Sequence, residues 1–162
     1  LDYKDLLVGT APSPQNARRV MALSEEVLNL AHQGTLQFEQ HGASASARLV
    51  NVAGRQRMLS QRMAKFYQAR AWNAAPDNAA GELEQARKEF LAGLAELEAA
   101  DVNTQAVRDQ LALGRQQWTF FDAALKGAGA DRRALAANVA TTSERILEVM
   151  DSVTGLYEKI LK

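Results

Sequence analysis

The chain has 162 residues, of which 47% are hydrophobic and 23% are charged, and its formal net charge is zero. This composition is ordinary for one globular domain with a substantial core, and the balanced charge argues against a nucleic-acid binder. Cysteine is absent, which excludes disulfides and thiolate metal sites, and no apolar run reaches the roughly 20 residues needed to cross a bilayer.

Abundant Ala, Leu, Glu, Gln and Arg with few prolines predict a helical protein. The first predicted helix has Ser13 as its N-cap and Pro14 in its first turn, and it extends to about His41. A second runs from about Ser44 to Trp72. The stretch between them is either a break or a weak point in one long helix, because a lone glycine costs a helix only about 1 kcal/mol.

Three more helices are predicted after Pro76. Asp77 is the expected cap of a helix that ends near Ala100, and the segment from Asp101 to Thr104 forms a short turn. A fourth helix carries apolar or small residues at helical spacing, namely Val107, Leu111, Gly114, Trp118, Phe121 and Leu125. Residues 126–130 end it, and Asp131 caps a fifth helix that runs almost to Lys162. Short loops imply an all-α fold, an antiparallel four-helix up-down bundle preceded by an additional N-terminal helix.

An internal repeat suggests how the chain is divided. The run from Ser24 to Leu28 (Ser-Glu-Glu-Val-Leu) is echoed by the run from Ser143 to Leu147 (Ser-Glu-Arg-Ile-Leu), and the same offset relates Val20 to Val139. We therefore expect residues 1–42 to be the C-terminal part of a preceding module and residues 43–162 to be a complete four-helix module.

The segment from Asn51 to Met63 gathers three arginines and a glycine on one predicted helix. A helical projection gives three faces. The core arc consists of Leu49, Val52, Ala53, Leu59, Ser60, Met63, Phe66 and Tyr67, with Gln56 as its one long polar member. A second stripe, spaced to seat another helix, contains Gly54, Arg57, Met58 and Gln61. A third face contains Asn51, Arg55 and Arg62.

No acidic residue occurs between Glu39 and Asp77, so the arginines are expected to lack partners on their own helix. If two copies crossed near Gly54, two Arg57 side chains would meet, and an anion between them would relieve their repulsion. Met58, a flexible apolar side chain predicted to lie far from the core, would suit an adaptable contact surface. The predicted ligand-binding residues are Arg57, Gly54, Asn51, Arg55, Met58, Gln61 and Arg62. The competing interpretation is a solvated or ion-paired face, neutralised by Glu82, Glu84 or Glu89 of the next helix.

The segment from Val50 to Tyr67, which contains Gly-Arg-Gln-Arg-Met-Leu-Ser-Gln-Arg-Met, resembles the signature of the PilJ-type domain. That domain is the N-terminal sensor module of type IV pilus methyl-accepting chemotaxis transducers. The closing helix from Ser143 to Tyr157 is similar to the last helix of that family. The resemblance implies a four-helix bundle, a periplasmic location and a ligand-binding or signalling role.

A more distant resemblance is to the periplasmic box of nitrate-sensing histidine kinases, on the residues Asn51, Gly54, Arg57, Met58, Ser60 and Arg62. In that box an arginine pair from two subunits binds nitrate across the dimer axis, and Arg57 stands at the matching position. The chain departs from the box at Arg55, Gln56 and Gln61, which leaves nitrate specificity open.

The function expected from the sequence is a periplasmic sensory module that binds a small anion such as nitrate at a homodimer interface. The alternative is a structural or protein-interaction module without a small ligand. An enzyme, a cofactor and a metal are not expected, and His32 and His41 lie on opposite sides of one predicted helix. The chain begins at Leu1, so we expect a processed or trimmed product whose signal peptide or membrane anchor lies outside this sequence.

Overall fold

The computed structural model describes residues 2–41, 45–127 and 131–160. In these ranges the chain forms six helices and no strand. They are α1 (Asp2–Gly9), α2 (Pro14–His41), α3 (Ala45–Ala71), α4 (Ala79–Glu98), α5 (Gln105–Lys126) and α6 (Arg132–Ile160). The all-α fold predicted from the sequence is confirmed.

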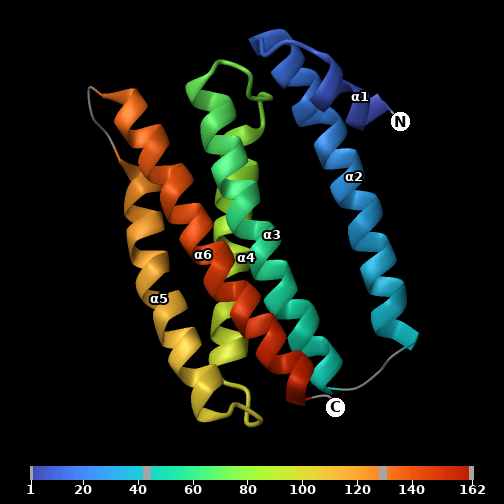
Figure 1. Ribbon diagram of the computed structural model, residues 1–162, viewed down its shortest axis with the longest axis vertical. Coiled ribbons are helices and arrows are strands. Elements are labelled where there is room, and N and C mark those ends of the chain that lie inside the picture. Colours follow the sequence, from blue (N-terminus) through green and yellow to red (C-terminus); the bar gives the residue numbers. More distant parts are fainter. Residues whose placement is uncertain (1, 42–44, 128–130, 161–162) are drawn as a thin grey trace.

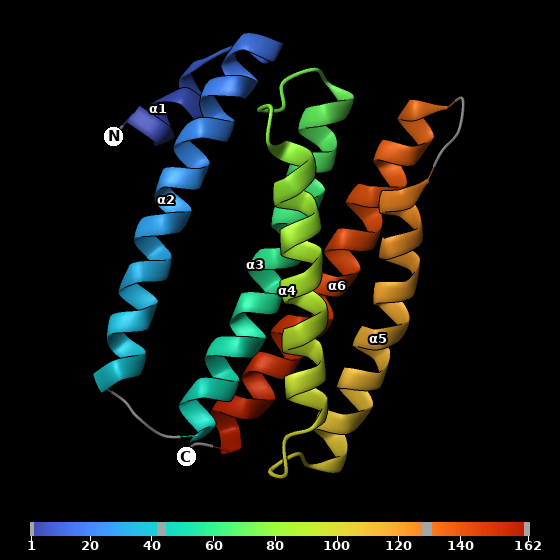
Figure 2. The ribbon, with the colours of Figure 1, turned by 180° about the vertical axis from the view of Figure 1, so that it is seen from behind.

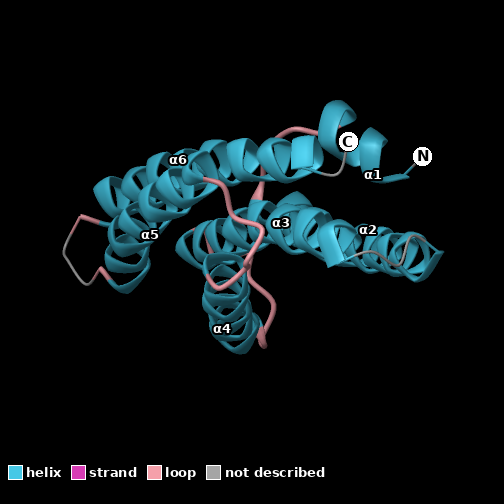
Figure 3. Cartoon of the chain, turned by 90° about the horizontal axis from the view of Figure 1, so that it is seen from below, coloured by secondary structure: helices cyan, strands magenta, loops and turns pink. Residues whose placement is uncertain are grey.

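Helices α3 to α6 form the predicted up-down bundle (Figure 1). Helix α3 packs most extensively on α6 and α4, and α5 packs on α6. Seen along the bundle, α4 and α6 lie on different sides of α3, and α2 lies beside α3 at the edge of the bundle (Figure 3). Helix α3, which carries the arginine motif, is therefore the central element of the molecule.

Helices α2 and α3 run antiparallel, side by side, in both ribbon views (Figures 1 and 2). The alternative of one long helix through Gly42 is therefore wrong, although residues 42–44 themselves lie outside the described residues. Helix α1 was not predicted. It precedes α2 and packs against it.

The core of the bundle is apolar and is built from the predicted faces. Leu59, Met63, Phe90, Leu94, Ile146 and Met150 have no exposed surface. Trp118, one of the apolar residues at helical spacing in α5, is buried and stacks on Phe90 with ring centroids 4.7 Å apart. Phe66 belongs to a smaller cluster with Met21, Ala69 and Ala79, which joins α2 to the bundle.

The helix caps follow the predictions in part. The Ser13 hydroxyl accepts a hydrogen bond from the backbone N–H of Asn16, and the Asp131 carboxylate accepts from those of Arg133 and Ala134. The prediction of Asp77 as the cap of α4 is wrong, because Asn78 occupies the cap position and makes no side-chain capping bond. Helix α3 ends before Asn73, whose φ of 55° is the left-handed conformation common just after helix ends.

Candidate functional site

The arginine motif lies in the middle of α3, and its residues point to three neighbouring helices. The predicted ligand-binding residues, Asn51, Gly54, Arg55, Arg57, Met58, Gln61 and Arg62, are all half-buried. Arg55 and Arg62 reach toward α2 and α4, whereas Arg57 and Gln61 contact α6. The predicted stripe is thus divided between two sides of α3.

Arg62 is the most enclosed of the three arginines and bridges three helices. Its guanidinium contacts Glu25 of α2 at 2.6 Å and Glu82 of α4 at 2.8 Å, and 15% of its side chain is exposed. Lys65 also contacts Glu25, at 2.6 Å. Burial alone would raise the pKa of Glu25, but hydrogen bonds from Arg62 and Lys65 hold that pKa below its ordinary value.

Arg55 forms a second link between α2 and α4. It contacts Glu89 at 2.5 Å, and its other terminal nitrogen lies 3.2 Å from His32 Nδ1. Burial raises the pKa of Glu89, yet hydrogen bonds from Gln85 and Arg55 bring that pKa below its ordinary value. Arg55 is therefore held in place by groups of its own chain.

Arg57 has the loosest ion pair of the three. It contacts Asp151 of α6 at 3.1 Å, with 42% of the arginine and 63% of the aspartate side chain exposed. Its Nε atom is buried and has no hydrogen-bond partner. The three arginines have no acidic partner on α3, as expected, but each is paired within its own chain. The competing interpretation is confirmed for Glu82 and Glu89 of α4, and α2 and α6 supply two further carboxylates, Glu25 and Asp151.

Gly54 leaves an opening on α3. A Cβ added to Gly54 would have no heavy atom within 4 Å among its neighbours on other elements. The backbone at this point therefore borders free space, on the side of α3 that faces α2 and α4. The prediction that Met58 lies far from the core is wrong, because Met58 is half-buried and packs against the main core cluster.

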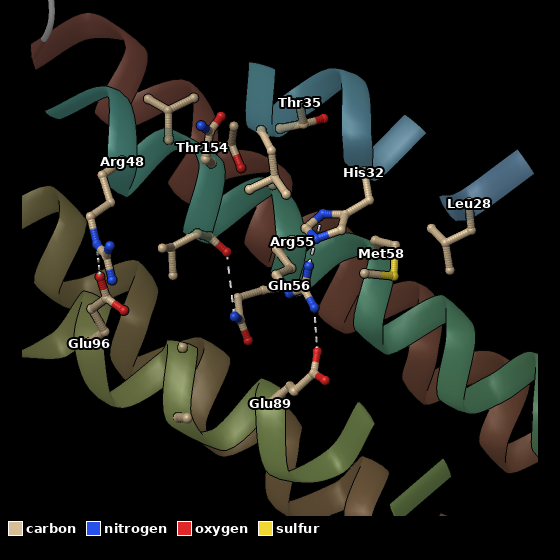
Figure 4. Close-up of a pocket in the computed structure, with 17 residues that line it drawn as sticks. Leu28, His32, Thr35, Arg48, Arg55, Gln56, Met58, Glu89, Glu96 and Thr154 are labelled. Atoms are coloured by element: carbon tan, nitrogen blue, oxygen red, sulfur yellow. Dashed lines mark hydrogen bonds and ion pairs between the residues drawn. The ribbon is translucent and has the colours of Figure 1, made fainter. Parts of the chain in front are cut away.

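Six of the motif residues line a groove between α2, α3 and α4, with a volume of about 660 Å³ (Figure 4). These residues are Asn51, Val52, Gly54, Arg55, Gln56 and Met58, and the walls across from them include His32, Thr35 and Glu89. Two ion pairs cross this region, Arg55–Glu89 and Arg48–Glu96. The groove is therefore polar at defined points and carries no net excess of either charge.

Gln56 lines this groove and is almost completely buried, with 1% exposure. Its amide nitrogen is 3.4 Å from the Val52 carbonyl, while its Oε1 atom has no partner. A Cβ at Gly93 of α4 would come within 2.1 Å of the Gln56 nitrogen. The helical projection predicted Gln56 to be the polar member of the core arc. Its contact with Gly93 could not be predicted in this way, because it depends on how α3 packs on α4.

The described part of the chain contains no group of three or more His, Cys, Asp or Glu side chains placed to hold a metal. No helix within these residues is both long and apolar enough to cross a membrane. His32, which was not expected to share a metal with His41, contacts Arg55.

Comparison with known proteins identifies the bundle. No curated protein and no solved structure shows significant similarity to the chain. The family model described as type IV pili methyl-accepting chemotaxis transducer N-terminal domain, PilJ, matches residues 40–155. The match includes all of α3, α4 and α5 and most of α6. The chain therefore belongs to the PilJ family, whose members are signal-transduction modules.

Proposed function

We propose that this chain is the periplasmic sensor module of a chemotaxis-type receptor and that two copies bind a small anion, such as nitrate, through Arg57. The membership of the PilJ family supports a sensory role. The observation that carries the anion proposal is the exposed, single-contact pair between Arg57 and Asp151, one turn from the open backbone at Gly54.

The internal ion pairs restrict the proposed anion site to the surroundings of Arg57. Arg55 and Arg62 have short contacts with partly buried carboxylates, so their charges are already balanced. An exposed pair such as Arg57–Asp151 contributes about 0 to 1 kcal/mol, which an incoming anion can replace. Across a two-fold axis at Gly54, two guanidinium groups would donate forked hydrogen bonds to one anion.

The position of α3 offers a way to convert binding into a signal. Helix α3 packs on both α6 and α4, and Arg57 and Gln61 both contact α6. An anion that draws Arg57 toward a second copy would break its contact with Asp151. A ligand with different affinities for two packings of α3 on α6 shifts the population between them.

Titration calorimetry with nitrate, nitrite, sulfate and short carboxylates tests this proposal. We expect at least one anion to bind the wild-type chain and Arg57→Ala to abolish the signal. Arg70→Ala is the matched control, since Arg70 is an exposed arginine near the end of the same helix. Equal binding by wild type and Arg57→Ala would refute the role of Arg57.

A second test removes the carboxylate that competes with the anion for Arg57. Asp151→Asn removes the internal partner of Arg57, so nitrate affinity should rise by up to about fivefold, which corresponds to about 1 kcal/mol for an exposed pair. Glu148→Gln, an exposed acid one turn away on α6, should leave the affinity unchanged. An equal rise in both variants would indicate only a general change in net charge.

The second candidate function is a protein-interaction module without a small ligand. The ion pairs of Arg55 and Arg62 with acids of their own chain favour it, because those side chains then stabilise the packing of the helices and are not available to a ligand. This alternative predicts a monomer at all concentrations that shows no heat with any of the anions.

A further inference from the structure

A second groove lies at the opposite end of α2 from the Gly42 connection, and we call it the N-terminal groove. It is bounded by α1, the first turns of α2, the last turns of α3 and the start of α6, and its volume is about 680 Å³. Figure 1 shows α1 and the beginning of α2 close to the last turns of α3. This size lies within the range typical of small-molecule sites.

The walls of the N-terminal groove are mainly apolar. They include Leu6, Leu7, Val20, Met21 and Trp72. Trp72 is 48% exposed and Leu7 is 52% exposed, so two large apolar side chains at the groove remain in contact with water. Trp72 directly follows the last residue of α3 and lies at this groove. Covering these side chains with an apolar ligand would be favourable.

The charged groups of the N-terminal groove are all basic. Lys65 and Arg133 line it, and none of its described lining residues is Asp or Glu. Lys65 is engaged with Glu25, whereas no carboxylate of the described residues lies within ion-pair distance of the exposed Arg133 guanidinium. Asp131, two residues away, uses its carboxylate to cap the start of α6.

We propose that the N-terminal groove binds a free small carboxylate with an aliphatic body. The aliphatic part would cover Trp72 and the leucines, and the carboxylate would accept hydrogen bonds from Arg133. A neutral molecule of the same shape lacks the charge that complements Arg133, and a cation of that shape is repelled. Neither Arg57 nor Asp151 lines the N-terminal groove, so this proposal does not depend on the anion proposed at Arg57.

Binding at this groove would connect α1 and α2 to the bundle. The present links at this end are the cluster around Met21 and Phe66 and a hydrogen bond of 2.9 Å from Arg18 to the Asn73 carbonyl. A ligand that contacts both the α1–α2 pair and the ends of α3 and α6 adds to these links. The N-terminal helices should therefore become more protected when the groove is filled.

Three probes with the same eight-carbon chain test the proposal on the full chain: octanoate, 1-octanol and octylammonium. Titration calorimetry should give the order octanoate, then octanol, with octylammonium weakest. Hydrogen exchange in α1 and the first turns of α2 should slow with octanoate. Octanol and octanoate binding equally well, or no binding of octanoate, would overturn the proposal.

Variants locate the interaction. Arg133→Gln should weaken octanoate binding about tenfold, the value expected for loss of a charged hydrogen bond, and leave octanol binding unchanged. Arg145→Gln, an exposed arginine on the same helix outside the groove, is the control and should bind octanoate like wild type. Both changes are on the surface, so circular dichroism should show an unchanged fold. An equal effect of the two variants on octanoate binding would contradict the assigned site.

Discussion

Gln56 and Gly93 show how a single residue sets the packing between two helices. The Gln56 side chain is buried between α3 and α4, and a Cβ at Gly93 would overlap its amide nitrogen. Its Oε1 atom has no hydrogen-bond partner, which is unusual for a buried polar group. Gly93 therefore provides the space that this amide needs.

Gly93→Ala should destabilise the bundle by about 1 to 3 kcal/mol, the usual effect of overpacking, which outweighs the gain of up to about 1 kcal/mol in helix propensity. In a Gln56→Ala background the overlap is gone, so the same substitution should be neutral or stabilising. Urea unfolding of the two single variants and the double variant gives the coupling free energy. Equal losses in both backgrounds would show that Gln56 is not the obstacle.

At the residue scale, the sequence predicted burial better than polar contacts. Helical periodicity correctly placed Leu59, Ser60 and Met63 inside, because burial depends mainly on which face of α3 meets the core. The partners of Arg57 and Arg62 include Asp151 and Glu25, which are distant in the chain. Such contacts depend on which helices are neighbours and on their register, and neither follows from a helical projection.

At the scale of elements, α2 is attached to the bundle by a few polar contacts and a small apolar cluster. Glu25 joins Arg62 and Lys65, His32 contacts Arg55, and Met21 packs with Phe66. Val27 and Leu30 of α2 remain exposed, whereas Ile146 and Val149, at the corresponding positions of the repeat, are buried. The division of the chain at residue 42 stays a prediction, and this exposure is consistent with a helix that belongs to another module.

Acid should release α2 before it unfolds the bundle. The pKa of Glu25 lies below its ordinary value of 4.5, so its stabilising contribution is complete above that value and is lost as the pH falls through the lowered pKa. Hydrogen exchange in α2, corrected for the intrinsic pH dependence, should therefore accelerate at about pH 3 relative to pH 7.

Glu25→Gln provides the matched measurement for this effect. It should raise α2 exchange at pH 7 by roughly tenfold, as expected for loss of a charged hydrogen-bonded pair. Glu26→Gln, an exposed neighbour, should have little effect. Protection of α2 that is independent of pH and unaffected by Glu25→Gln would show that the apolar cluster alone holds this helix.

The boundaries of the elements were predicted where a local signal exists. Ser13 and Asp131 cap their helices as expected, because a cap involves only the first turn. The prediction of Asp77 as a cap was wrong by one residue, because α4 begins at Ala79 and Asn78 directly precedes it. Helix α1 is too short to show a clear periodic pattern, and much of its stability must come from packing on α2.

At the scale of the whole molecule, the up-down bundle followed from helix lengths and short loops. The order of contacts did not, because connections show which helices are consecutive but not that α3 packs most extensively on the closing helix α6. This contact makes α3 the shared element of the core, the arginine motif and the α2 attachment. A shift of α3 would therefore alter its contacts with α2, α4 and α6.

The most direct test of the proposed sensor is whether nitrate promotes association of two copies through α3 at Gly54. Gly54→Ala adds a methyl group where the single chain has free space, so the monomer should gain up to about 1 kcal/mol in stability while a helix crossing at this point is blocked. Gly81→Ala has the same free space on α4 and serves as the control.

Sedimentation velocity over a range of concentrations, with and without nitrate, measures this association. We predict that nitrate lowers the dimer dissociation constant about tenfold or more, equivalent to about 1.4 kcal/mol, for wild type and Gly81→Ala but not for Gly54→Ala. A wild-type chain that sediments as a monomer at every concentration, with or without nitrate, would contradict the proposed site at Arg57.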